Sequence, residues 1–117
     1  WVVSVGGVEG ATLDDMRAAI DGIEAAVAGK TVEDYRTDWL LKHAVQRGIE
    51  IISKASRALP DEVTGLRPDI PWLQVRGIGN VLRHDYHGLS DTIIWGVVVD
   101  ELPPLRDAIV WLQERFG

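Results

Sequence analysis

The sequence predicts an all-α fold, an up-and-down bundle of four to five helices, from three observations. All five prolines lie at or after Pro60, so the first half of the chain is free to form long helices. Apolar residues recur at three- and four-residue steps, which is the spacing of one buried helix face. Only residues 92–99 have the β-branched composition of a strand, and a lone strand would have nothing to pair with.

The first helix is expected to begin after Thr12 as its N-cap and to end at Gly29. Asp14 and Asp15 lie in the first turn, where the helix dipole favours negative charge. This helix is expected to bury one apolar face, made of Leu13, Met16, Ile20, Ile23 and Val27.

Thr31 is expected to open a long second helix that ends just before Pro60. A helix of this length needs more than one partner to cover its apolar residues, which indicates a bundle. Those residues are Leu40, Leu41, Ala44, Val45, Ile49, Ile52, Ala55 and Leu59. Residues 60–71 follow as the only clear loop, because they contain three prolines, one glycine and three acids.

Pro71 is expected at the first position of a third helix that covers residues 72–87. Residues 91–102 come next, and their pattern alone leaves strand and helix open. Pro103 and Pro104 are expected to start the last helix. Its buried face would consist of Leu105, Ile109, Leu112 and Phe116.

The composition argues against several classes of protein. The chain has no cysteine, which excludes a disulfide framework, cysteine-ligated zinc, an iron–sulfur cluster and a thiol nucleophile. Its net charge of −6 argues against general DNA coating and against a polybasic membrane anchor. Residues 1–38 hold eight acids and three bases, whereas residues 39–117 hold ten acids and nine bases. A local cationic site is therefore still open in the later part of the chain.

The chain is interpreted as one domain over residues 12–117. Residues 1–11 are interpreted as an N-terminal extension or a cloning remnant, because the chain starts at Trp1 rather than at Met. No apolar run approaches the roughly 20 residues of a membrane span, and the N-terminus lacks the basic start of a signal peptide. We therefore expect a cytoplasmic protein with no membrane partner.

Candidate chemistry is concentrated between Trp72 and His87. At about 100° per residue, one polar stripe of the third helix would carry Arg76, Asn80, Arg83, His84 and His87. Arginine binds phosphate groups with paired hydrogen bonds, and a histidine can move the proton of an attacking hydroxyl. The stripe therefore suits an anion such as a phosphodiester. The alternative is a solvated helix face with incidental histidines.

Three further sets of residues are candidates for a functional role. His43 and Arg47 are one turn apart and either line an RNA groove or form a plain polar strip. No metal site is expected from His84, His87 and Asp85, because Asp85 points about 100° away from His84 and no further ligand is evident. We expect buried anchors of the bundle, rather than surfaces on which bases stack, at Trp39, Trp95 and Trp111.

The segment PWLQVRGIGNVLRHDY resembles the signature region of the HepT-like branch of the HEPN family. The family pattern has a Pro-Trp start, a Gly-x-Arg-Asn run and then a His-x-Tyr. Three runs outside this segment, GKTVEDYRTD, GIEIISKAS and DELPPL, also match family features in order, so the resemblance covers about residues 12–116. The matched signature residues are Pro71, Trp72, Asn80, His84 and Tyr86.

The resemblance implies a HEPN-like homodimer in which residues 91–102 are helical. It also implies a metal-independent endoribonuclease without a cofactor, the toxin of a bacterial type VII toxin–antitoxin system of the HepT/MntA kind. The implied partners are an RNA substrate, with tRNA as a candidate, and an antitoxin that is an MNT-type nucleotidyltransferase.

Roles for individual residues also follow from the resemblance. His84 would act as general base toward the ribose 2′-hydroxyl, and Asn80 would orient the phosphate or His84. Tyr86 would be the residue to which the antitoxin attaches AMP, which silences the toxin. The alternative for Tyr86 is a core aromatic side chain.

One position departs from the family pattern: Gly79 stands where the family has its catalytic arginine. Arg83 is the preferred substitute and Arg76 the other, since a guanidinium from either position could reach a shared phosphate. If neither substitutes, the chain would be a catalytically weak or inactive member. It would then act as an interaction or nucleotide-binding module with a nucleotidyltransferase partner.

Overall fold

The computed structural model describes the backbone of residues 2–84 and 90–116, and the side chains of residues 10–84 and 91–116. These residues form helices only, and no strand occurs among them. The predicted all-α fold is confirmed. The elements are α1 (Val2–Val27), α2 (Val32–Thr37), α3 (Trp39–Ala58), α4 (Asp61–Thr64), α5 (Trp72–Arg83), α6 (Ser90–Gly96), the π-helical segment η1 (Val97–Glu101) and α7 (Leu102–Phe116).

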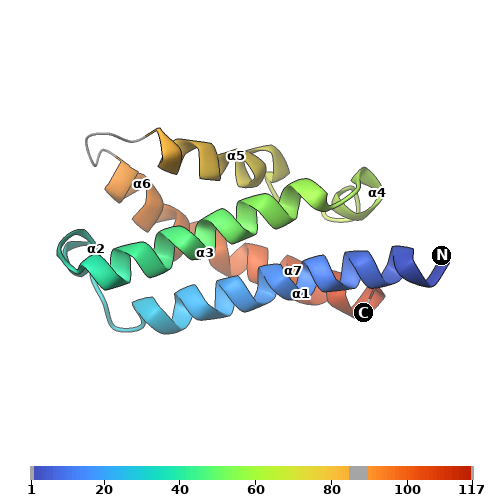
Figure 1. Cartoon of the computed structure of the whole chain (residues 1–117), viewed down its shortest axis with the longest axis horizontal. Helices are drawn as coiled ribbons and strands as arrows, with labels where there is room; N and C mark the ends of the chain where they lie inside the picture. Colours follow the sequence, from blue (N-terminus) through green and yellow to red (C-terminus); the bar gives the residue numbers. More distant parts are fainter. Residues whose placement is uncertain (1, 85–89, 117) are drawn as a thin grey trace.

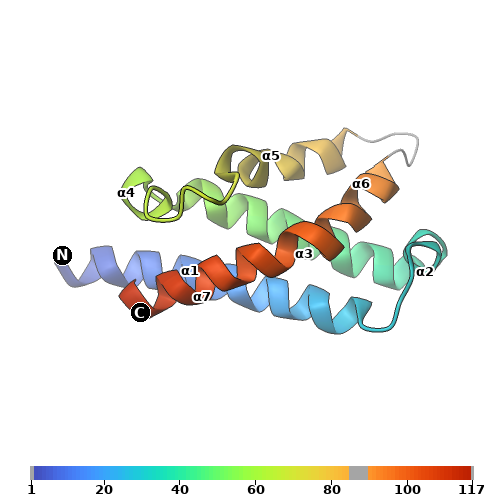
Figure 2. The same cartoon turned by 180° about the vertical axis from the view of Figure 1, so that it is seen from behind.

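The four long arms of the bundle alternate in direction (Figure 1). α1 and α3 run antiparallel, α5 returns alongside α3, and α6, η1 and α7 together form the fourth arm. Residues 91–102 are therefore helical, as the family resemblance implies, and not a strand. Seen from behind, α7 packs across α1 (Figure 2). None of the described helices is long and apolar enough to cross a membrane.

The hydrophobic core lies where α1, α3 and α7 meet. The face predicted for the first helix is buried, except that Val27 is only half-buried. Each fully buried Leu or Ile side chain stabilises the fold by about 1.5–3 kcal/mol relative to exposure. The three helices contribute Leu13, Met16, Ile20, Ile23, Leu41, Val45, Ile49, Ile52, Leu105, Ile109 and Leu112 to this core.

The prediction of a single long helix after Thr31 is wrong, because the backbone at Asp38 interrupts it and separates α2 from α3. Thr31 does cap α2, and its hydroxyl accepts the N–H of Asp34 while the Asp34 carboxylate accepts the N–H of Thr31. These hydrogen bonds hold the pKa of Asp34 below its ordinary value of 3.8. Asp38 then has an extended backbone, and its carboxylate accepts the N–H of Leu41, 3.1 Å away.

Other helix ends also differ from the prediction. α1 begins at Val2 rather than after Thr12, and the backbone at Gly10 lies against the end of α7, where an added Cβ would be 3.6 Å from the carbonyl oxygen of Phe116. Gly29 does end the first helix, with a φ of 73° that favours glycine. The loop over residues 60–71 contains the short helix α4.

The helix that carries the polar stripe is shorter than predicted. Pro71 is its N-cap, so Trp72 is the first residue of α5. α5 ends at Arg83, and His84 follows as its C-cap, with its N–H bonded to the carbonyl oxygen of Asn80 at 3.2 Å. Residues 85–87, which were expected to continue this helix, lie outside the described residues.

Candidate active site

Three residues of the predicted polar stripe share one exposed side of α5. Asn80 and Arg83 are exposed near the end of the helix, and His84 is exposed directly after it. Residues three and four apart on a helix are neighbours, so the spacing brings these side chains together. Within the described part of the chain, no hydrogen bond or ion pair occupies these three side chains. All three side chains are exposed, so a ligand can approach them from solvent.

Gly79 lies on the side of α5 that packs against α3. It is buried, and its N–H donates to Ser53 Oγ at 3.3 Å. A Cβ added to Gly79 would lie 3.0 Å from Ser53 Oγ and 3.3 Å from Arg83 Nη1. The guanidinium of Arg83 therefore folds back over the position where the family signature has its arginine. Any side chain at residue 79 would require Ser53 or Arg83 to move.

Arg76 points away from this group, toward the end of α3. Its Nε donates to the carbonyl oxygen of Ser56 at 3.4 Å, and its Nη2 is 3.9 Å from the exposed carboxylate of Asp61. Its own carbonyl oxygen accepts the hydroxyl of Ser53 at 2.7 Å. Arg76 therefore ties α5 to α3, and the structure does not bring its guanidinium to the exposed group of Asn80, Arg83 and His84.

A second arginine, which the sequence pattern does not single out, reaches the same helix junction. Arg57 lies on α3, and its Nη1 donates to Ser53 Oγ and to the carbonyl oxygen of Arg76, at 3.0 Å each. The side chain is otherwise exposed. The small residues Ser53 and Ser56 are the available sequence signal, because they allow a close helix approach on this face of α3. That signal does not say which helix approaches.

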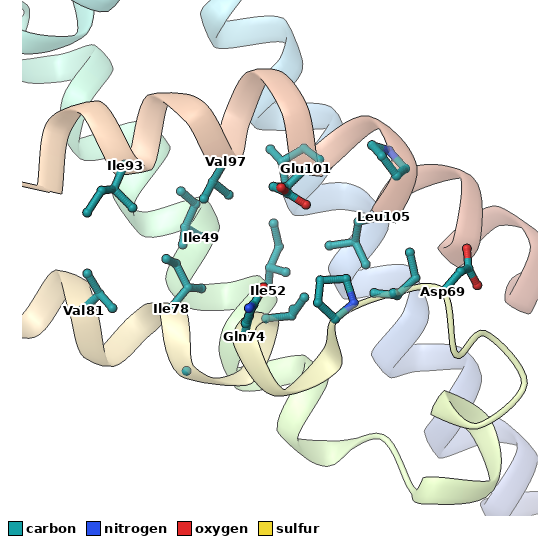
Figure 3. Close-up of a pocket in the computed structure, with 16 residues that line it drawn as sticks. Ile49, Ile52, Asp69, Gln74, Ile78, Val81, Ile93, Val97, Glu101 and Leu105 are labelled. Atoms are coloured by element: carbon teal, nitrogen blue, oxygen red, sulfur yellow. The ribbon is translucent and has the colours of Figure 1, made fainter.

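An apolar groove of about 610 Å³ lies on the adjacent side of α5, facing α6, η1 and α7 (Figure 3). Ile78 and Val81 of α5 face Ile93 and Val97 across it. The side chains of Val81 and Ile93 are 41% and 56% exposed, although both are large and apolar. Such an exposed patch is typical of an interaction surface.

A few polar side chains lie among the apolar ones of the groove. Glu101 of η1 and Asp69 both line it, with Leu105 between them (Figure 3). Arg67 donates to both carboxylate oxygens of Asp69, at 3.0 and 2.8 Å. These hydrogen bonds hold the pKa of Asp69 below its ordinary value of 3.8.

The remaining candidate residues are placed as follows. Asp85, Tyr86 and His87 lie outside the described residues, so the structure does not place the predicted modification site. Over residues 10–84 and 91–116, no three His, Asp or Glu side chains are grouped to hold a metal ion. His43 and Arg47 lie on the exposed face of α3, and Arg47 is paired with Glu50 at 3.7 Å.

The prediction that Trp39 is a buried anchor is wrong. Its side chain is 69% exposed, and its ring stacks on that of His43 with centroids 4.1 Å apart. The reason is the break at Asp38, which makes Trp39 the first residue of α3 and places it at the end of the bundle. Trp95 and Trp111 are half-buried and pack against the core.

Comparisons with known proteins agree on one family. The family model described as "Ribonuclease HepT-like" matches residues 16–110. The chain is 33% identical over 94 residues to a protein of Thermococcus cleftensis named "Probable ribonuclease HepT", which covers 80% of this chain and 86% of that protein. It is 34% identical over 89 residues to a "Putative RNase" of Caldanaerobacter subterraneus subsp. tengcongensis, covering 76% of this chain and 80% of that one.

A third relative carries the same kind of segment in a longer protein. It is the "Gamma-glutamylcyclotransferase and putative RNase" of Methanocaldococcus jannaschii, 32% identical over 104 residues. The match covers 89% of this chain and 47% of that protein. No solved structure matches the chain significantly.

Proposed function

The chain belongs to the HepT-like ribonuclease family, and from this premise we propose that it is a metal-independent endoribonuclease whose active site lies at the end of α5. The observation that carries the proposal is the position of Arg83. Its guanidinium covers Gly79, where the family signature has an arginine, and it lies beside Asn80 and His84. The site thus has a cation, an amide and an imidazole on one exposed surface.

Each of these groups has a role in cleavage by the ribose 2′-hydroxyl. His84 accepts the proton of that hydroxyl, and the 2′-oxygen attacks the adjacent phosphorus. Arg83 stabilises the negative charge that develops on the phosphate oxygens, and Asn80 orients the phosphate or the imidazole. The bond from phosphorus to the 5′-oxygen then breaks, and the leaving oxygen takes a proton from solvent. The products are a 2′,3′-cyclic phosphate and a 5′-hydroxyl.

The substrate is single-stranded or loop RNA, with tRNA as one candidate. Only RNA has the 2′-hydroxyl that this reaction needs, and unpaired nucleotides can bend so that the hydroxyl reaches the phosphorus. Support comes from the exposure of Arg83 and His84, since a surface site can accept a long polymer.

The active form is a homodimer that pairs through the face of α5 and α6. We infer that a second copy of the chain binds in the groove, because residues of α5 form both one wall of the groove and the polar stripe. Val81 and Ile93 are the apolar side chains that such pairing would cover. The polar stripes of the two copies would then lie near the twofold axis of the dimer and form a shared cleft.

In the cell, the protein is the toxin of a type VII toxin–antitoxin system and is inhibited by an MNT-type nucleotidyltransferase that attaches AMP to Tyr86. This part rests on the resemblance of the signature segment. An attached AMP would add bulk and negative charge two residues after His84, which would oppose the binding of an RNA phosphate.

Expression in bacteria tests the proposal as a whole. We expect the protein alone to stop growth and degrade RNA, and co-expression of a neighbouring nucleotidyltransferase to restore both. Normal growth and intact RNA with the protein alone would contradict it.

A non-catalytic member of the family is the second candidate. It is favoured by the close packing of Gly79 on Ser53, which leaves no room for the arginine of the signature. Such a protein would bind a nucleotidyltransferase partner and would leave RNA intact.

A further inference from the structure

One buried hydroxyl lies where α3 packs against α5, near the side chains of Arg57 and Arg83 and the backbone carbonyl of Arg76. Ser53 is 1% exposed. Its hydroxyl donates to the carbonyl oxygen of Arg76 at 2.7 Å, and it accepts hydrogen bonds from Arg57 Nη1 at 3.0 Å and from the N–H of Gly79 at 3.3 Å. Arg83 Nη1 approaches the same place, 3.3 Å from the Cβ position of Gly79. The helix junction therefore fixes the guanidinium of Arg57 through Ser53, and that of Arg83 lies beside Gly79 at the same junction.

Among the described residues, the guanidinium groups of Arg57 and Arg83 have no carboxylate partner. Asp61 is 3.9 Å from Arg76, but over residues 10–84 and 91–116 no carboxylate lies within 4.0 Å of Arg57 or Arg83. A guanidinium has five N–H donors, and Arg57 uses only Nη1 in its hydrogen bonds to Ser53 and Arg76. No carboxylate of the described residues neutralises either guanidinium group, so the free N–H donors of both can bind an RNA phosphate.

This cationic area continues the candidate active site onto a second helix. Ser53 Oγ lies 3.0 Å from the Cβ position of Gly79 and 3.0 Å from Arg57 Nη1, so Arg57 is beside the residue that Arg83 covers. Both arginine side chains are exposed. An RNA strand that places one phosphate at Arg83 and His84 would therefore pass over Arg57 as it crosses from α5 to α3.

We propose that Arg57 is a substrate-binding residue, which together with Arg83 holds the RNA backbone next to the phosphate that is cut. Arginine matches the geometry of a phosphate with two parallel hydrogen bonds, and the Ser53 hydroxyl holds Arg57 in place before RNA arrives. Arg57 has no part in the chemistry of the cut. This inference rests on the proposed function, because it assigns a further residue to the same RNA site.

The salt dependence of RNA binding tests the proposal directly. The probe is a fluorescent 2′-O-methyl RNA oligonucleotide, which cannot be cleaved because its 2′-oxygen carries no proton to remove. We expect Arg57→Ala to weaken binding about tenfold and to lower the slope of log K against log salt by about 0.7, the change expected when one phosphate contact to a single strand is lost. Arg47→Ala is the matched control: this arginine is also exposed on α3, but it is paired with Glu50, and we expect parental binding.

Two variants separate phosphate binding from a structural role. Ser53→Ala loosens the same helix junction without removing a charge, so the slope should stay at the parental value. Arg57→Lys keeps the charge and should also keep the slope. If Arg57→Ala does not fold, Arg57→Gln removes the charge, retains an amide donor for Ser53 and should lower the slope in the same way.

The possible failures are distinguishable. An unchanged slope in Arg57→Ala, with RNA cleavage intact in the parent, overturns the role of Arg57 and leaves the proposed function standing. A parental protein that neither binds the probe nor cleaves RNA overturns both.

Discussion

The guanidinium of Arg83 covers Gly79: Nη1 of Arg83 lies 3.3 Å from the point that a Cβ on Gly79 would occupy. The two residues are one helical turn apart on α5, so this contact is a local one. The HepT-like signature has an arginine at residue 79, and here a cation reaches the same place from residue 83. This relationship decides what each substitution at the site should do.

The first prediction concerns the choice between two arginines. Arg83→Ala should slow RNA cleavage about 10²–10³-fold, because it removes the cation that stabilises the developing charge. Arg76→Ala should slow cleavage far less. It should instead lower the melting temperature, because Arg76 Nε bonds the carbonyl oxygen of Ser56 across the helix junction. Single-turnover cleavage and thermal denaturation of both variants measure this, and loss of cleavage in Arg76→Ala alone would reverse the assignment.

The second prediction concerns the contact at Gly79. Gly79→Ala should destabilise the protein by about 1–3 kcal/mol, because the new Cβ would lie 3.0 Å from the buried Ser53 Oγ. In a double-mutant cycle, Gly79→Ala should cost less in a Ser53→Gly background than in the parent, because Ser53→Gly removes the atoms that the new Cβ would approach. Urea denaturation of the single and double variants provides the free energies. A Gly79→Ala variant as stable as the parent would mean that α3 and α5 are not packed this closely.

The third prediction concerns the dimer. Ile93→Glu should convert the protein to a monomer, because it places a charge on an apolar surface that pairing would bury. Leu40→Glu is the matched control: Leu40 is 70% exposed but lies outside the groove, so this variant should stay dimeric. Sedimentation at micromolar concentration distinguishes the two states. A monomeric parent, or a dimeric Ile93→Glu, would refute pairing through this groove.

The fourth prediction concerns the modification. When the protein is co-expressed with its neighbouring nucleotidyltransferase, mass spectrometry should find AMP on Tyr86. Tyr86→Phe should remove the modification and leave the toxin active. If the nucleotidyltransferase still inhibits the Tyr86→Phe toxin, the modification is not the cause of inhibition, and binding of the partner alone would account for it.

Most of the fold could be predicted because it depends on local patterns. The buried faces of α1 and α7 follow the three- and four-residue spacing, and Thr31 was identified as a cap from its side chain and the acids that follow. The break at Asp38 was missed because an aspartate in a helical pattern is equally compatible with an exposed helix position. The exposure of Trp39 follows from that break and was missed with it.

The site could be predicted only along one helix. Helical spacing predicts that Asn80, Arg83 and His84 lie together, and the structure places all three as exposed residues at the end of α5. Spacing alone could not show that Arg76 bonds to α3 or that Arg57 comes to the same junction, because both depend on which helices pack together. The groove was missed for the same reason, since its walls come from α5 and from elements that follow it.

The central claim is that His84 removes the proton of a ribose 2′-hydroxyl, and RNA cleavage by purified His84→Ala tests it most directly. His84 is exposed, so the variant should fold as the parent does. With EDTA present, we predict that the parent yields 2′,3′-cyclic phosphate and 5′-hydroxyl ends and that His84→Ala is at least about 100-fold slower. Equal cleavage rates for the parent and a folded His84→Ala would contradict the account.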